Sequence, residues 1–172
     1  MGVIGPTVES PDATEKIERQ IERLPAHQYC VFRAGRERYC LSVSEVEEVV
    51  EWSTLTRIPL APPFLMGILN LRGVIIPVLD IAVKEGRRPG AEPTHIVVAI
   101  WGGETHQPTG SPMRVGFAAD EMLGTYFSSE ALLVEEAPSE VLHCRGMLRH
   151  GDRLALALSL DRLHEAFPVP II

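Results

Sequence analysis

Short apolar runs of strand length, separated by turn residues, make up most of this chain of 172 residues. Gln28–Arg33 and Arg38–Val43 are rich in aromatic and β-branched residues and flank the turn Ala34–Glu37, so they predict a hairpin. Roughly eight to ten such segments follow one another, and long helical patterns are lacking. This pattern indicates small β-barrels or a β-sandwich and disfavours a doubly wound α/β sheet.

The remaining expected elements continue this pattern to the end of the chain. The further predicted strands are Val50–Trp52, Val74–Leu79, His95–Trp101, Arg114–Ala119, Gly124–Phe127, Cys144–Arg149 and Arg153–Ser159. Short helical turns are expected at Glu45–Val49 with Ser44 as the cap, at Pro63–Leu69, at Ser128–Leu132 and at Leu160–Phe167. Lys84–Pro93 and Gly102–Pro112 contain glycine and proline and are expected to be exposed loops.

Residues 1–27 differ from the rest and are interpreted as an N-terminal extension before a domain at 28–168. Ser10 followed by Pro11 is typical of a helix start, and Pro25 ends the pattern. Between them the apolar residues recur at helical spacing, as Ala13, Ile17, Ile21 and Leu24. The extension is therefore expected to contain a short amphipathic helix, which would need a surface to dock on.

Charge and composition exclude several classes of protein. The formal net charge is −7, and the sequence has no basic run of the kind that grips a phosphate backbone, so nucleic acid is not an expected partner. No apolar stretch is long enough to span a bilayer, and the polar N-terminus does not resemble a signal peptide. The three cysteines are an odd number, which favours a reducing cytoplasm and buried free thiols.

The sequence contains no arrangement typical of a catalytic or metal site. Its 6 histidines are scattered, no two cysteines stand two residues apart, and no phosphate-binding glycine loop occurs. Cys144 beside His143 is the best catalytic candidate, but adjacent strand residues point to opposite faces. Asp120 and Glu121 more plausibly end a strand and begin a turn than share a proton. The expectation is a protein without catalytic residues, metal or cofactor.

The most informative stretch is Gly67–Asp80, with the sequence Gly-Ile-Leu-Asn-Leu-Arg-Gly-Val-Ile-Ile-Pro-Val-Leu-Asp. Its physical interpretation is a short helix that ends at a turn, where Gly73 permits a left-handed residue, followed by a buried strand. Arg72 lies just before that glycine. A cation at such a rigid point is either a structural ion-pair partner or a recognition residue, and the residues alone leave both open.

This segment strongly resembles the hallmark of the CheW family of bacterial chemotaxis coupling proteins, Gly-x-x-Asn-Leu-Arg-Gly-x-x-(Ile/Val)-Pro-x-x-Asp. The resemblance covers roughly Gln28–Phe167. It is carried also by Tyr29–Leu41, Val46–Val49, Thr56–Pro59, Ala61–Phe64, Val115–Phe117 with Asp120-Glu121, Cys144–Met147 and Gly151–Leu163. It implies a mainly β fold of two small SH3-like β-barrel subdomains that share a core, with short helices and a C-terminal helix.

The resemblance also implies a function and a set of site residues. Such proteins are non-catalytic adaptors that connect the cytoplasmic tips of methyl-accepting receptors to the regulatory domain of a CheA-type histidine kinase, at the inner face of the membrane and without inserting into it. Partner binding in the family transfers to Gly67 and Arg72 and, less directly, to Val46. Asn70 and Gly73 are expected to shape the turn and to be possible partner contacts.

Two alternatives from other classes accompany this interpretation. One is a ligand-sensing β-barrel regulatory protein with a small-molecule cleft between the subdomains, which convergent polar groups in a pocket would favour. The other is the cysteine hydrolase described above. The sequence leaves open which receptors and kinase would be served, and whether the pathway is flagellar chemotaxis or pilus-based motility.

Overall fold

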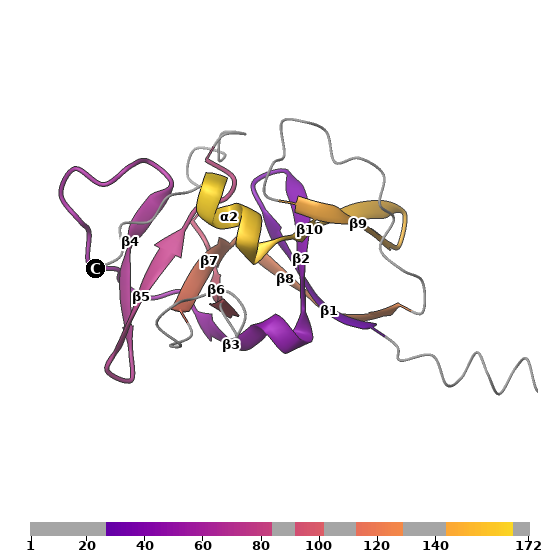
Figure 1. Ribbon diagram of the computed structural model, residues 1–172, viewed down its shortest axis with the longest axis horizontal. Coiled ribbons are helices and arrows are strands. Elements are labelled where there is room, and N and C mark those ends of the chain that lie inside the picture. The colour runs from indigo at the N-terminus through magenta and orange to yellow at the C-terminus, as the bar shows by residue number, and fades with distance from the viewer. Residues whose placement is uncertain (1–26, 84–91, 102–112, 129–143, 167–172) are drawn as a thin grey trace, which may run out of the picture.

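Within the residues that it describes, the computed structural model contains two five-stranded β-sheets and one α-helix (Figure 1). The structure describes residues 27–83, 92–101, 113–128 and 144–166. The elements are β1 (His27–Ala34), β2 (Glu37–Ser42), the 3₁₀ turn η1 (Val43–Glu45), β3 (Val46–Glu51), β4 (Leu65–Leu71), β5 (Val74–Leu79), β6 (His95–Trp101), β7 (Met113–Ala119), β8 (Glu121–Ser128), β9 (Cys144–His150), β10 (Arg153–Leu158) and α2 (Leu160–Ala166). This is the mainly β architecture that the sequence predicted.

The first sheet joins the two ends of the described chain in the order β8-β1-β2-β10-β9. The β1–β2 pair is the expected hairpin, closed by a turn in which Gly35 has φ +63°. β10 runs parallel to β2, and β9 pairs with β10 in a second hairpin. Within the described ranges no ladder joins the edge strands β8 and β9, so this sheet is curved without being closed by strand pairing.

The second sheet contains the central part of the chain in the order β3-β6-β7-β5-β4. An isolated bridge between Thr56 and Ile68 connects the segment after β3 to β4, the strand at the opposite edge. Two backbone hydrogen bonds form this bridge, with N–O distances of 3.0 and 2.9 Å. This bridge brings the two edges of the sheet together, as in a barrel. Within the described ranges no continuous strand pairing closes the barrel.

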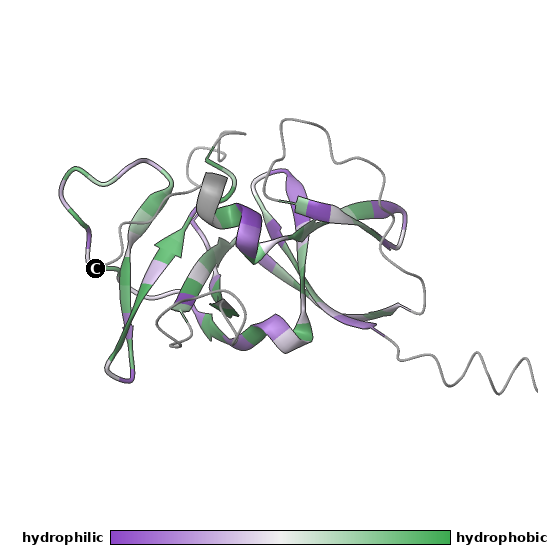
Figure 2. Ribbon diagram, viewed as in Figure 1, coloured by the Kyte–Doolittle hydropathy of each residue, from purple (hydrophilic) through white to green (hydrophobic). Residues whose placement is uncertain are grey.

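Alternating side chains give each sheet its own interior and place a third core between the sheets. On β1, Val31 packs inside the first sheet whereas Phe32 packs into the shared core. On β6, Ile96 and Val98 pack inside the second sheet and Val97 faces the shared core. The colouring of Figure 2 follows this pattern, with apolar residues along the strands and polar residues at the turns. The two subdomains therefore share one hydrophobic core, as expected.

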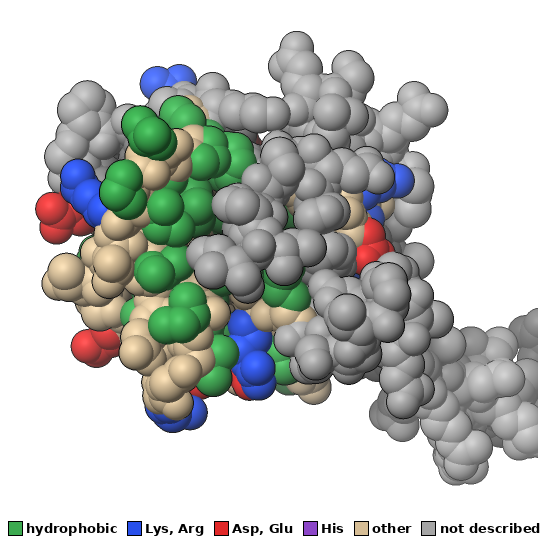
Figure 3. Space-filling view, turned by 60° about the vertical axis from the view of Figure 1, so that its left-hand side comes forward, with side chains coloured by type: hydrophobic (Ala, Val, Ile, Leu, Met, Phe, Trp, Pro, Cys, Tyr) green, Lys and Arg blue, Asp and Glu red, His purple; other side chains and the backbone are tan. Residues whose placement is uncertain are grey.

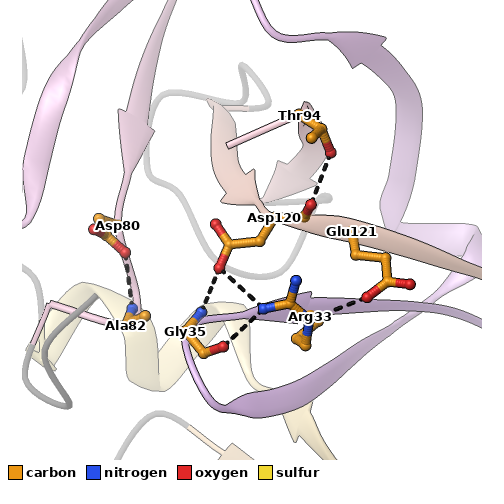
Figure 4. Close-up of polar contacts among 7 residues, drawn as sticks. All are labelled: Arg33, Gly35, Asp80, Ala82, Thr94, Asp120 and Glu121. Carbon is orange, nitrogen blue, oxygen red and sulfur yellow. Dashed lines mark hydrogen bonds and ion pairs between the residues drawn. The ribbon is translucent and has the colours of Figure 1, made fainter. Parts of the chain in front are cut away.

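Asp120 stands where the chain crosses from the second sheet to the first, between β7 and β8. Its Oδ2 accepts hydrogen bonds from the backbone N–H of Gly35 at 2.8 Å and from Arg33 Nη1 at 3.4 Å. Its carbonyl oxygen accepts a bond from Thr94 Oγ1 at 3.0 Å, and Arg33 Nε also bonds Glu121 (Figure 4). Asp120 and Glu121 thus each bind Arg33, and Asp120 follows the end of β7 as expected, but Glu121 begins the strand β8 and not a turn.

Helix α2 covers the junction of the two sheets (Figure 1) and confirms the expected C-terminal helix. Leu160 and Leu163 contribute to the shared core. The connection from β2 to β3 is held by a second contact: Arg145 on β9 donates to both carboxylate oxygens of Glu45, at 3.1 and 2.8 Å. The subdomains are therefore fixed to each other by apolar packing and by this ion pair.

Two of the expected helical turns are wrong. Val46–Glu51 and Leu65–Leu71 are strands, and the short turn before β3 is Val43–Glu45. Ser42 rather than Ser44 begins that turn, because its backbone N–H bonds Glu45 Oε2 at 3.1 Å. Leu65 and Leu69 are four residues apart, which fits one face of a helix and also alternate positions of a strand. The segment pairs with β5 along its length and is therefore a strand.

Several expectations fall on residues outside the described ranges. These are the N-terminal helix, the turn at Ser128–Leu132 and the loops at 84–91 and 102–112. The cysteines are described: Cys30, Cys40 and Cys144 are all buried and free, as expected. Cys40 is paired with Val31 and not with Cys30, so the two hairpin cysteines face opposite sides of the sheet.

Candidate partner-binding surface

The β4–β5 hairpin carries most of the residues singled out in the sequence. Leu71 pairs with Val74, so that Arg72 and Gly73 form a two-residue turn. Both have positive φ, at 52° and 86°, which is the backbone of a type I′ turn. Asn70 Oδ1 accepts a hydrogen bond from the N–H of Gly73 at 2.9 Å and thereby fixes the turn. The expected helix end is corrected to a hairpin, while the left-handed Gly73 is found.

Arg72 extends from this turn to β3 and forms a two-pronged ion pair with Glu48. Its Nη1 and Nη2 donate to the two carboxylate oxygens at 3.2 and 3.0 Å. The Arg72 side chain is nevertheless 77% exposed, against 25% for Glu48. Water screens a pair of this kind, so its contribution to folding is about 0–1 kcal/mol. The pair orients the guanidinium and leaves it accessible. Arg72 is thus an ion-pair partner that also remains available for recognition, which combines the two interpretations that the sequence left open.

A second ion pair lies next to the first on β3. Glu47 accepts hydrogen bonds from Arg114 on β7, with an Nη2–Oε1 distance of 2.8 Å. The Arg114 hydrogen bond and charge, with a smaller effect of Arg72, hold the pKa of Glu47 below its usual value. β3 thus carries two neighbouring carboxylates, each paired with an arginine from another part of the second sheet. Such a mixture of charges favours a partner with complementary charges over one with a single sign.

Exposed apolar side chains continue from the turn along β5. Val74 is 40% and Ile75 is 53% exposed, and Val49 on β3 is 39% exposed. Figure 3 shows hydrophobic side chains gathered at the end of the molecule that bears β4 and β5, with basic side chains along the lower edge. We call Asn70–Ile75 together with Glu48 the hairpin corner. It combines an oriented cation with accessible apolar area, the composition typical of binding surfaces.

Gly67 and Val46 lie elsewhere in the second sheet. Gly67 is buried in β4, five residues before Arg72, with φ +152°. A Cβ at this position would lie 2.6 Å from the carbonyl oxygen of Thr56. Val46 is half-buried at the start of β3 and packs on the shared core. The structure therefore brings Asn70, Arg72 and Gly73 together and separates Gly67 and Val46 from them.

Glu48 and the exposed apolar residues were missed by the sequence interpretation. Because Glu45–Val49 was expected to be helical, the side chains of this segment had no assigned direction. An acidic residue three positions before the end of a strand is a weak signal by itself. Only the return of the β4–β5 turn onto β3 identifies it as the partner of Arg72.

No group of three metal-ligating side chains occurs among the residues that the structure describes. Cys144 is fully buried, its carbonyl oxygen accepts a hydrogen bond from Arg162 at 2.8 Å, and His143 lies outside the described ranges. No helix in the described ranges is long and apolar enough to cross a membrane.

The family model of the CheW-like domain matches residues 28–167. The chain belongs to the CheW-like domain family. The matched residues begin one position after the start of β1 and end one position after α2, so the CheW-like domain includes both sheets and the helix. The expected family and fold are confirmed, with the barrels left open as described above.

Named relatives and a solved structure agree with this assignment. A protein described as "Probable chemotaxis protein CheW" from Rhizobium etli is 35% identical over 69 residues, 39% of this chain and 44% of that protein. The chemotaxis protein CheW of Thermotoga maritima is 26% identical over 140 residues, 80% of this chain and 87% of that protein. The match to the Rhizobium etli protein thus spans less than half of that relative's length.

A solved structure shares the fold. The crystal structure described as "scaffolding protein TtCheW" from Thermoanaerobacter tengcongensis superposes with a TM-score of 0.67 and 25% identity. The superposition covers 78% of this chain and 85% of that chain. Protein FrzA of Myxococcus xanthus is also similar, at 31% identity over 102 residues, 58% of this chain and 58% of that protein. The likeness therefore extends over both subdomains of the CheW-like domain.

Proposed function

We propose that this protein is a non-catalytic scaffold that couples methyl-accepting chemoreceptors to a CheA-type histidine kinase. The family membership supports the coupling role, and the hairpin corner is the observation that carries the proposal of where a partner binds. Arg72 there is held in a fixed orientation by Glu48 and is 77% exposed. An oriented, accessible guanidinium loses little conformational entropy when a partner carboxylate replaces or joins Glu48.

The apolar part of the corner supplies the rest of the proposed interface. Val74 and Ile75 flank the cation on β5. Their exposed area gives a partner hydrophobic surface to bury, while Arg72 sets the register of binding. Asn70 and Gly73 act by fixing the turn that presents Arg72. The corner is small, which favours a reversible interface over a permanent one.

Gly67 and Val46 take part through the backbone and the core in this proposal. A side chain at Gly67 would displace the Thr56 segment and change the position of β4. Val46 begins the strand that carries Glu48, so its packing on the shared core places the acidic partner of Arg72. Substitution of either residue would then weaken partner binding indirectly.

The proposed mechanism is positional. The scaffold binds a receptor tip and the kinase regulatory domain at once, in the cytoplasm at receptor arrays on the inner face of the membrane. A small receptor movement then changes the populations of active and inactive kinase, because each partner binds the assembly with different affinity in the two states. No covalent step on this chain is needed.

Co-sedimentation tests the proposal most simply. Purified protein is mixed with receptor-containing membranes and a CheA-type kinase from the same source, and each component is measured in the pellet. The proposal expects the scaffold to pellet with receptor membranes and to raise the amount of kinase that pellets. It fails if the folded protein leaves the kinase distribution unchanged and pellets with neither partner.

A further inference from the structure

A pocket of about 360 Å³ opens on the second sheet and is lined by residues that do not belong to the hairpin corner. It lies between the segment that follows β3 and the residues that precede β6. Met66 on β4 also lines it. The coupling role as proposed makes no use of it.

Backbone hydrogen bonds hold the walls of this pocket. Trp52 N–H donates to the carbonyl oxygen of Thr94 at 2.9 Å, which joins the end of β3 to the start of β6. Thr56 and Ile68 exchange two hydrogen bonds, which join the opposite wall to β4. The absence of a side chain at Gly67 allows the Leu55–Thr56 segment to lie directly on β4. The pocket is therefore largely preformed, which lowers the cost of filling it.

Half of the residues that line the pocket are apolar. They are Trp52, Leu55, Met66 and Pro93. Trp52, Leu55 and Met66 also pack against the interior of the second sheet, so their positions are fixed from behind. An indole beside a thioether offers a polarisable surface that suits an aromatic or branched apolar group.

The remaining lining residues are polar and include both signs of charge. Arg57 and Glu92 line the pocket, together with the hydroxyl residues Ser53 and Thr54. In the part of the chain that the structure describes, no ion pair joins Arg57 or Glu92 to another side chain. A guanidinium and hydroxyls are the groups that bind a carboxylate, and a carboxylate is the group that binds an ammonium ion.

We propose that this pocket binds a small zwitterionic ligand of the amino-acid class with an aromatic or branched apolar side chain. The carboxylate of the ligand would pair with Arg57, its ammonium group with Glu92, and its side chain would lie against Trp52. The pocket volume of about 360 Å³ is near the lower end of the roughly 300–1,000 Å³ usual for ligand-binding pockets, which favours a small ligand. An amino acid fits this volume. The inference stands independently of the coupling role.

Titration with L-phenylalanine, followed by amide NMR shifts and by tryptophan fluorescence, tests the proposal. We expect saturable shifts at Ser53–Arg57 and at Met66, with a Kd of roughly 0.1–5 mM, a range suited to a shallow site. Two analogues test the charges: phenethylamine lacks the carboxylate and 3-phenylpropionate lacks the ammonium group. Each should bind about 2- to 5-fold more weakly, since each loses one ion pair to a solvent-exposed side chain of the protein.

Single substitutions separate the two charges further. Arg57 and Glu92 are both exposed, so Arg57→Gln and Glu92→Gln should fold normally. Each should weaken phenylalanine binding about 2- to 5-fold, and Glu92→Gln should remove the preference for phenylalanine over 3-phenylpropionate. Arg149→Gln on β9 is the matched control and should leave binding unchanged. The proposal is overturned if phenylalanine, leucine and tryptophan give no saturable shift up to about 20 mM, or if 3-phenylpropionate binds the unchanged protein as well as phenylalanine does.

Discussion

The carbonyl oxygen of Thr56 occupies the space where a side chain at Gly67 would begin, with a distance of 2.6 Å from that oxygen to the Cβ position. The contact is fixed because Thr56 also exchanges backbone hydrogen bonds with Ile68. Gly67 therefore allows the segment after β3 to lie on β4. Gly67 thus has a structural role: it sets the position of β4, and through β4 it affects both the hairpin corner and the pocket.

Gly67→Ala should destabilise the domain strongly. The added Cβ would collide with backbone that is held by two hydrogen bonds, and φ +152° is unfavourable for any residue with a side chain. We expect a loss of about 2 kcal/mol or more in the free energy of unfolding, measured by urea denaturation.

Gly73→Ala is the matched control. Nothing lies within 4 Å of a Cβ there, so only the left-handed backbone is penalised, at about 1 kcal/mol. If Gly67→Ala costs no more than Gly73→Ala, then the close approach of Thr56 does not constrain the fold and the structural role assigned to Gly67 is wrong.

Asp120→Ala should loosen the crossing between the two sheets. It removes the acceptor of the Gly35 N–H and of the Arg33 guanidinium, which leaves the partly buried donors without their partner. The expected cost is about 1–3 kcal/mol in the free energy of unfolding, and Asp120→Asn, which keeps one acceptor oxygen, should cost less. Glu121→Gln serves as the control because Glu121 is 56% exposed. Equal stability of Asp120→Ala and the unchanged protein would contradict this account.

The Cys40 thiol should be unreactive in the folded protein. Burial, helped by the nearby Cys144 and Cys30, raises the pKa of Cys40 from 9.0 to about 12. At pH 8 the thiolate fraction is then lower than that of an ordinary thiol by about a thousandfold. Alkylation with iodoacetamide, followed residue by residue by mass spectrometry, should show Cys40 protected in the native protein and modified in urea. Equal rates in the two states would show that this thiol is accessible.

The same shift predicts a loss of stability at alkaline pH. A thiol whose pKa is higher in the folded state than in the unfolded state stabilises the fold fully below its unfolded pKa. For Cys40 this contribution should be lost as the pH rises from about 9 to about 12. Urea denaturation of the unchanged protein and of Cys40→Ala at pH 8 and pH 10.5 measures it. The difference in stability between the two proteins should shrink at the higher pH, and a constant difference would contradict the assignment.

Much of the fold could be predicted from the sequence because its strands carry strong local signals. The β1–β2 hairpin follows from aromatic and β-branched runs on both sides of Gly35, and the β9–β10 turn follows from Gly151. β4 was misread because Leu65 and Leu69 satisfy the helical and the strand period alike. Long-range pairing with β5 decides between the two, and no local pattern contains that information.

The candidate site was predictable only in part, for a related reason. Arg72 and its turn could be located from the family motif, whereas Glu48 could not, since the two are 24 residues apart and meet only after the second sheet has formed. The pocket depends likewise on three segments that come together in the fold. Charges without a sequence pattern, such as Arg57 and Glu92, give no signal until those segments are placed.

Reversal of the Arg72–Glu48 pair separates its structural role from its binding role. Arg72→Glu with Glu48→Arg restores an ion pair of opposite polarity, so the free energy of unfolding should lie within about 1 kcal/mol of that of the unchanged protein. Partner binding should remain weak, because the cation no longer stands on the turn. Recovery of binding in the double variant would show that the pair matters only for folding.

The affinity of Arg72→Glu for the kinase regulatory domain and for receptor tips, measured by isothermal titration calorimetry alongside its melting temperature, tests the central claim most directly. Arg149→Glu, an exposed arginine on β9, is the matched control. The account predicts at least about a 10-fold higher Kd for one or both partners, a melting temperature within about 3 °C, and an unchanged Kd for the control. A folded Arg72→Glu protein that binds both partners as before, or a variant that unfolds, would contradict it.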